Sequence, residues 1–221
     1  MVKSMDDVAE EIAKLSFDSG FVKVNFKDLI TWPNGVKEPI YVDNGKWNYY
    51  PEKKRILVDG FMRLMRKANI PDEGVVVVGA PTSGISPGTS LADRCGYPFA
   101  HVEDSLEISG LPYDNFKGQR VLLVEEVIAS GRNSIRAVQA IRDKKGEVHH
   151  CFVIFDYGFE HTRDRFAGKR EFNDEGARLL PSCEVFSLYD FDTLLRVGKN
   201  GSYIKDDERA FLDEWRRAYS I

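Results

Sequence analysis

A run of apolar residues that ends in two adjacent acids constrains the fold of this chain more than any other feature. Residues 121–124 read Val-Leu-Leu-Val, and Glu125 and Glu126 follow directly. A short loop of small residues then contains Gly131, and an amphipathic stretch begins at Ser134. A short apolar run bounded by a turn is typical of a strand buried inside a parallel sheet, and the stretch after it predicts a helix.

The loop between this strand and this helix has the chemistry of a sugar-phosphate site. The first N–H groups of a helix have no partner inside the helix, so they can bind a phosphate. Carboxylates at the carboxyl end of a parallel strand, here Glu125 and Glu126, can bind ribose hydroxyls or a hydrated Mg²⁺. We therefore expect this segment to bind a phosphorylated sugar.

Strands and helices alternate along the rest of the chain, which predicts an α/β fold with a mainly parallel sheet flanked by helices. Further buried strands are expected at residues 74–79, 97–102, 148–155 and 184–188. Helices are expected at residues 53–68, 88–94, 134–144, 161–166 and 191–197. Ligands in such folds bind at the carboxyl ends of the strands. The loops expected there are residues 80–86, 103–118 and 127–133.

The length of 221 residues and the hydrophobic content of 43% fit a single domain, residues 1–221, with a substantial core. We expect residues 1–50 to form an N-terminal cap region, with a helix at residues 5–15. Residues 51–200 form the expected core. Residues 201–221 contain a helix with one apolar stripe, which is typical of a helix that packs on the core or on a partner.

Composition and charge disfavour several classes of function. The net charge is −4 and no block of lysine or arginine occurs, so nucleic-acid binding is disfavoured. The three cysteines are widely spaced and odd in number, which favours reduced thiols in a cytoplasmic protein. No apolar stretch approaches the length of a membrane span, so we expect no membrane insertion.

Five segments occur in an order and spacing that are specific when taken together. They are residues 31–44, 79–85, 121–134, 155–159 and 187–195. In these segments the chain resembles the type I phosphoribosyltransferases, and among them the orotate phosphoribosyltransferases. The resemblance runs from about residue 21 to residue 219. It implies the type I phosphoribosyltransferase fold with a small N-terminal cap.

The resemblance also implies a function in pyrimidine nucleotide biosynthesis. A homodimer would bind Mg²⁺ with phosphoribosyl pyrophosphate (PRPP) and transfer ribose 5-phosphate to a pyrimidine base. The PRPP-binding residues would be Glu125, Glu126, Ala129, Ser130, Gly131, Arg132 and Asn133, with Glu125 and Glu126 meeting the metal indirectly through Mg²⁺–PRPP. The pyrophosphate loop would be Ala80, Pro81, Thr82, Ser83 and Gly84. The base-side residues would be Lys37, Tyr41 and Tyr157.

The loop after the expected strand 97–102 departs from the family. There the family carries Arg-Lys, a further Lys and a His, which neutralise the departing pyrophosphate. This chain has three acids and a serine at those positions: Glu103, Asp104, Glu107 and Ser109. Fixed positive charge at a developing anion lowers the barrier, and losing one such contact costs on the order of 10²–10³ in rate. Lys117 is the one basic residue late in this loop, and we expect it to be solvated.

Smaller departures affect the PRPP motif and the base side. Glu126 is one methylene longer than the usual Asp, and Ala129 lacks a hydroxyl. Arg132 replaces a small residue, and two interpretations remain open: its guanidinium clamps a phosphate, or it fills the pocket. Gly45 replaces an arginine, and Glu38 replaces a serine. The base pocket could therefore favour a base other than anionic orotate.

Some base-side residues have equally plausible structural roles. Tyr157 follows a strand and could contact the base or pack in the core. Lys37 could face the site or the solvent.

Two hypotheses on function follow. The first is an active phosphoribosyltransferase of the orotate type. The alternative is a catalytically impaired or inactive relative that binds a nucleotide or sugar phosphate as a sensor or partner subunit. The acids at the cation positions favour the alternative, whereas the retained phosphate-binding motif fits both. A heterodimer with an active relative that supplies the missing cations is a third arrangement consistent with the sequence.

Overall fold

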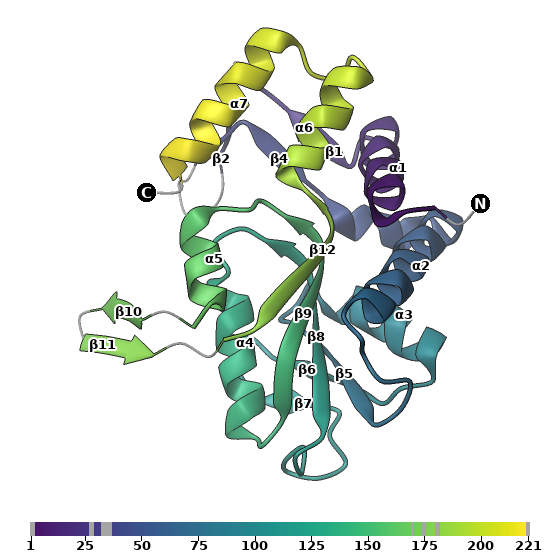
Figure 1. The fold of residues 1–221 in the computed structure, drawn as a ribbon, viewed down its shortest axis with the longest axis vertical. Helices are drawn as coiled ribbons and strands as arrows, with labels where there is room; N and C mark the ends of the chain where they lie inside the picture. Colours follow the sequence, from purple (N-terminus) through teal and green to yellow (C-terminus); the bar gives the residue numbers. More distant parts are fainter. Residues whose placement is uncertain are drawn as a thin grey trace.

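The computed structural model describes residues 3–26, 29–31, 37–168, 170–173, 176–179 and 182–219. Its centre is a six-stranded sheet in the order β12-β9-β8-β5-β6-β7 (Figure 1). The strands are β5 (Val75–Gly79), β6 (Phe99–Val102), β7 (Ile108–Ser109), β8 (Arg120–Ile128), β9 (Glu147–Asp156) and β12 (Glu184–Asp190). Every neighbouring pair is parallel except β6 with β7. The predicted mainly parallel sheet is thus confirmed.

Helices cover both faces of the sheet because the strands are apolar on both sides. Val75 and Val77 of β5 pack in a core with α2 (Pro51–Lys67) and α3 (Ile85–Cys95). Val76 and Val78 alternate to the opposite face and pack with α4 (Arg132–Asp143). α5 (Glu160–Phe166) packs on that second face through Phe166.

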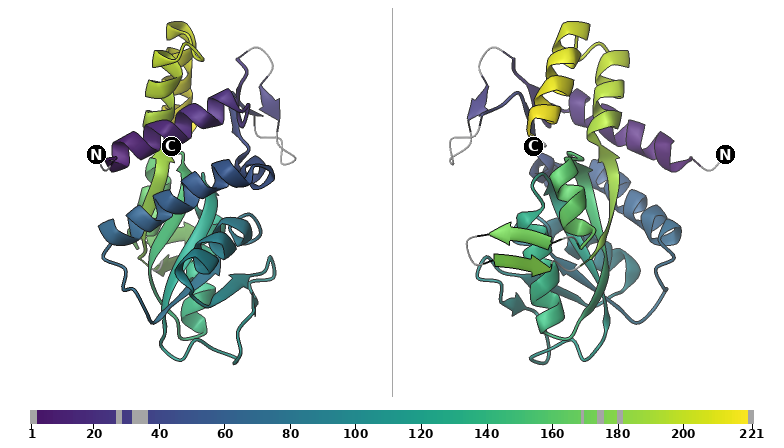
Figure 2. Two further views of the ribbon diagram at one scale, coloured as in Figure 1. Left: turned by 90° about the vertical axis from the view of Figure 1, so that its right-hand side faces the viewer. Right: turned by 60° about the vertical axis from the view of Figure 1, so that its left-hand side comes forward.

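The remaining elements gather beyond one end of the sheet, as Figure 2 shows. They are α1 (Met5–Asp18), β1 (Val22–Val24), β2 (Ile30–Thr31), β3 (Lys37–Glu38), β4 (Ile40–Val42), the 3₁₀ helix η1 (Asn44–Tyr49), α6 (Phe191–Asn200) and α7 (Asp206–Tyr219). α1 begins in a capping box, in which the Ser4 hydroxyl accepts from the Asp7 N–H and the Asp7 carboxylate accepts from the Ser4 N–H. We call α1 through η1 the cap.

The strand that carries the two acids is longer than the sequence pattern indicated. We expected a strand that ends at Glu125, but β8 continues to Ile128 and pairs with β9 as far as Asp156. Both carboxyl groups have hydrogen-bond partners on neighbouring elements, so the strand can include them without leaving buried acids unsatisfied. Glu126, like Glu125, therefore lies inside the strand rather than after it.

Two further expectations were wrong in detail. Residues 103–118 do not form one continuous loop, because β7 pairs antiparallel with β6 and makes a hairpin. α3 begins at Ile85 rather than at residue 88. The antiparallel pair β10 (Arg170–Asn173) and β11 (Gly176–Leu179), which projects from the body in Figure 1, was not predicted.

Cys95, Cys151 and Cys183 are free thiols. Within the described part of the chain, no helix is both long enough and apolar enough to cross a bilayer.

Candidate active site

Three loops converge where the parallel strands end. Residues 80–84 follow β5, residues 103–107 follow β6, and residues 129–131 follow β8. The first loop packs tightly on β8: the Ala80 N–H donates to the Val124 carbonyl over 2.9 Å. A Cβ on Gly84 would lie only 2.2 Å from that same carbonyl oxygen, so only glycine fits there. The predicted pyrophosphate loop is therefore held against the strand that carries the acids.

Glu125 is buried on the face of the sheet that α4 covers, with only 4% of its surface exposed. Its carboxyl group accepts three hydrogen bonds. Ser83 Oγ donates to Oε1 over 3.1 Å, the Glu126 N–H donates to Oε1 over 2.9 Å, and Ser134 Oγ donates to Oε2 over 3.0 Å. Burial outweighs these bonds and raises the pKa of Glu125 to about 7.

Glu126 points to the other face, because successive side chains of a strand alternate. There it meets the cap, where the Gly45 and Asn44 N–H groups bond its carboxylate. The Ser83 hydroxyl, which donates to Glu125, also lies close enough to lower the pKa of Glu126. Burial raises the pKa of Glu126, and the nearby Asp43 carboxylate adds to that shift. Glu126 is only partly buried, so of the two predicted acids it is the one that retains access to solvent.

Asn44 fastens the cap to this site and is almost completely buried. Its Oδ1 accepts from Trp47 Nε1 at 3.2 Å and from the Tyr189 hydroxyl at 3.3 Å. Its Nδ2 donates to the Glu126 carbonyl at 3.4 Å. The sequence analysis did not identify Asn44 as a site residue, although its position two residues after the end of β4 was a signal.

The predicted phosphate loop is shaped by a left-handed residue and supported by α5. Gly131 has a φ of +69°, and a Cβ there would lie 2.9 Å from both Phe166 and Thr162. Thr162 Oγ1 donates to the Ala129 carbonyl, and an Arg165 amine donates to the Ser130 carbonyl. Because α5 donates hydrogen bonds to two of its carbonyl groups, the loop is held in place. It leads into the N-terminus of α4, whose N–H groups face the site.

Arg132 and Asn133 occupy the first two positions of α4, and both are exposed. The positive charge of Arg132 acts on the hydroxyl of Tyr219 at the end of α7 and lowers its pKa, although burial and Glu38 raise it overall. The guanidinium thus lies between the phosphate loop and the C-terminal helix.

The acidic residues after β6 form a fixed hairpin. The Glu103 N–H donates to the Glu107 carbonyl over 2.8 Å. The Glu103 carboxylate accepts hydrogen bonds from Ser109 and from His101, whose Nε2 lies 2.8 Å away, and these bonds lower its pKa. Leu106, Ile108 and Leu111 pack against the core. Glu103 and Ser109 stand at two of the four positions where this chain lacks the family's Arg, Lys or His. They are hydrogen-bonded to each other.

Lys117 cannot replace the missing cations. The Phe116 N–H donates to the Lys144 carbonyl and the Gly118 N–H donates to the Lys145 carbonyl, both in the turn after α4. This turn lies at the amino ends of the strands, opposite the site. Lys117 Nζ lies 3.5 Å from the centre of the Tyr113 ring, and Lys117 is exposed as expected.

The base-side residues are distributed over different environments. Lys37 is exposed on β3, and the pKa of the partly exposed Tyr41 is raised by burial, then by Asp43 and Glu126. Tyr157 is only 4% exposed and packs between Phe159 and Trp215. The structure therefore gives Tyr157 a packing environment. Residues 32–36 of the resembling segment lie outside the described residues.

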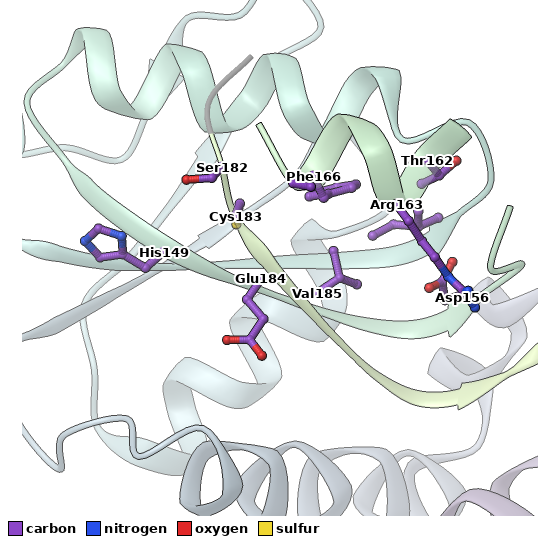
Figure 3. Close-up of a pocket in the computed structure, with 11 residues that line it drawn as sticks. His149, Asp156, Thr162, Arg163, Phe166, Ser182, Cys183, Glu184 and Val185 are labelled. Carbon is purple, nitrogen blue, oxygen red and sulfur yellow. The ribbon is translucent and has the colours of Figure 1, made fainter. Parts of the chain in front are cut away.

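A separate groove of about 530 Å³ lies between α5 and β12 (Figure 3). In Figure 3, Arg163 extends from α5 towards Asp156 at the end of β9. Burial raises the pKa of Asp156, while the Gly158 N–H and Arg163 oppose that shift. None of the predicted PRPP-binding, pyrophosphate-loop or base-side residues lines this groove.

Curated relatives match nearly the whole chain. Orotate phosphoribosyltransferase of Staphylococcus aureus (strain Mu50 / ATCC 700699) is 30% identical over 213 residues, which cover 95% of this chain and 98% of that protein. Orotate phosphoribosyltransferase of Coxiella burnetii is 28% identical over 213 residues, 95% of each chain. No protein-family model matches.

Solved structures agree in fold. Leishmania donovani UMP synthase superposes with a TM-score of 0.71 at 20% identity, covering 94% of this chain and 42% of that one. Orotate phosphoribosyltransferase from Aeropyrum pernix superposes with a TM-score of 0.63 at 18% identity, covering 87% of this chain and 98% of that one. The expected type I phosphoribosyltransferase fold is confirmed.

Proposed function

The chain belongs to the orotate phosphoribosyltransferase family, and from that membership we propose that it transfers ribose 5-phosphate from PRPP to orotate. The products are a pyrimidine nucleotide and pyrophosphate. The observation that carries the proposal is the match over 213 residues, because it spans every loop that would hold a substrate. The shared name of these relatives favours the transferase over a non-catalytic sensor.

The geometry supports a division of tasks at the carboxyl ends of the strands. The N–H groups at the start of α4, with Ser130, would hold the 5-phosphate. Residues 80–84 would hold pyrophosphate through their backbone amides. Glu126, on the cap side, would accept hydrogen bonds from the ribose hydroxyls. Each group lies at the end of a rigid element, so little reorganisation is needed when the substrate binds.

Magnesium would enter with PRPP. Mg²⁺ usually keeps several waters and binds through one or two carboxylates together with substrate phosphates. The Asp43 carboxylate lies close enough to Glu126 to raise its pKa, and the two acids fit such an open site. Within the described ranges, no three His, Cys, Asp or Glu side chains converge as a full protein cage would require. The bound ion would neutralise part of the charge on pyrophosphate.

The hairpin after β6 makes this transferase slow. Its acids repel the pyrophosphate leaving group, and Lys117 lies at the wrong end of the sheet to compensate. We expect turnover well below that of a relative with cations at these positions, because a lost contact to a developing anion costs on the order of 10²–10³ in rate. The homodimer implied by the resemblance is part of the proposal, and the mass in solution tests it.

The proposal is tested by calorimetric titration with Mg²⁺ and PRPP, with and without orotate, followed by an assay of the same sample for pyrophosphate release. Binding with release that depends on orotate supports the proposal. Binding without release would instead support the non-catalytic alternative. Absence of binding would contradict both, and Glu126→Gln provides a control that should weaken PRPP binding.

A further inference from the structure

Glu125 links two loops that have no other described side-chain bridge between them. Ser83 belongs to the loop after β5, and Ser134 belongs to the first turn of α4. Each hydroxyl donates to a different oxygen of the same carboxyl group, over 3.1 and 3.0 Å. In the proposed function the first loop holds pyrophosphate and the second holds the 5-phosphate. The spacing of the two phosphate sites therefore depends on one side chain.

Glu125 is more enclosed than Glu126. It is 4% exposed, and both oxygens of its carboxyl group accept hydrogen bonds from protein donors, whereas Glu126 is only partly buried. Because β8 continues to Ile128, the pleat places these neighbours on opposite faces. The existing bonds of Glu125 fit a role in holding the loops rather than in binding the ribose.

We propose that Glu125 is a positioning residue that clamps the pyrophosphate loop to the 5-phosphate loop, while the more accessible Glu126 meets the ribose. This proposal rests on the proposed function, since it assigns the two loops their ligands. It alters the expectation from sequence that both acids approach Mg²⁺–PRPP.

The experiment compares Glu125→Gln, Glu125→Ala and Glu126→Gln by steady-state kinetics between pH 5.5 and 8.5. Glu126→Gln should lower kcat/KM by roughly a hundredfold at every pH, because a contact to the substrate is lost. Glu125→Ala should raise KM for PRPP by roughly tenfold, the loss expected for a buried hydrogen-bonded link, with a smaller effect on kcat. Glu125→Gln should recover most of that loss.

Two results would overturn the clamp. If Glu125→Gln is as impaired as Glu126→Gln over the whole pH range, then the charge of Glu125 itself meets the substrate. If Glu125→Ala retains the wild-type KM and pH profile, then the loops do not depend on it.

Failure of the proposed function is distinguishable from failure of the clamp. If the wild-type protein neither binds PRPP nor turns it over, thermal unfolding of Ser83→Ala, Ser134→Ala and the double variant decides. The shifts in Tm should be non-additive in the wild-type background and additive in Glu125→Ala, because the link runs through that carboxyl. Additive shifts in both backgrounds contradict the clamp.

Discussion

Adjacent residues of β8 experience different chemistry. The carboxyl group of Glu125 is enclosed by donors from two loops, and that of Glu126 lies against backbone N–H groups of the cap. The pKa values of both are raised, and burial is the main cause in each case. Neighbouring residues of a strand lie on opposite faces, so their carboxyl groups differ in access to solvent, to protein donors and to substrate.

Glu125→Gln should remove one component of the pH dependence of stability. The folded pKa of about 7 lies above the ordinary value of 4.5, so the folded state retains a proton that the unfolded state releases. The wild-type free energy of unfolding should therefore fall, relative to the variant, as pH rises from about 4.5 to about 7, by roughly 3 kcal/mol. Urea unfolding at several pH values measures this difference. Parallel curves for the two proteins would show that Glu125 does not hold the proton.

Gly131→Ala should destabilise the protein more than the same change at Gly96. Both glycines have φ near +70°, and a non-glycine residue there costs about 1–2 kcal/mol. A Cβ at Gly96 meets nothing within 4 Å, whereas one at Gly131 lies 2.9 Å from Phe166 and Thr162. We expect an additional loss of roughly 1–3 kcal/mol at Gly131. The free energy of unfolding of both variants is measured by chemical denaturation. Equal losses would mean that α5 moves to accommodate the Cβ with no loss of stability.

At the scale of elements, the β6–β7 hairpin contrasts with the phosphate loop. Both follow strands of the same sheet, but the hairpin carries acids. Its apolar residues Leu106, Ile108 and Leu111 pack against the core. A segment with packed apolar residues and internal hydrogen bonds has little freedom to close over a ligand. The charge and the rigidity of this hairpin together explain why we expect slow turnover.

The triple variant Glu103→Arg, Asp104→Lys and Glu107→Lys should raise kcat by tenfold or more, because positive charge would again face the leaving pyrophosphate. The gain need not be the sum of three single effects. Single-turnover release of pyrophosphate measures it. Asp114→Lys, Asp143→Lys and Glu147→Arg form a control of equal charge at the amino ends of the strands. An equal gain in the control would indicate a general charge effect rather than a local one.

At the scale of the molecule, α7 contributes two side chains to an aromatic cluster with the residues that follow β9. Trp215 lies 6.2 Å from Tyr157 and 5.8 Å from Phe159, and Tyr219 lies 4.9 Å from Phe159, between ring centres. The C-terminal segment therefore packs on the residues that follow β9. The end of α7 also lies close enough to the phosphate loop for the charge of Arg132 to act on Tyr219.

Leu212→Ala should destabilise the whole molecule by about 2–5 kcal/mol, because the side chain is fully buried in the main core. Phe211→Ala is a matched control on the same helix, since Phe211 is 41% exposed and should cost less. Unfolding followed by tryptophan fluorescence reports on both. Equal losses would show that α7 does not depend on this core contact.

Local patterns accounted for much of the fold. The apolar runs of β5, β8 and β9 predicted buried strands, and the spacing in α1 and α7 predicted their amphipathic helices. The short strand β7 and the pair β10–β11 were missed, because strands of two to four residues carry too little periodicity to be recognised. The end of β8 was also predicted too early. Two adjacent acids usually follow a buried strand, and only their hydrogen-bond partners in the folded protein show that they lie inside one.

Residue type and local order were enough to predict the parallel sheet, the phosphate loop and the acids at the expected cation positions. Three features emerged only from the folded structure: Glu125 and Glu126 lie on opposite faces of β8, Glu103 bonds His101 and Ser109, and Lys117 lies at the far end of the sheet. These facts depend on contacts between segments distant along the chain. The pairing register and packing that create such contacts are properties of the folded molecule.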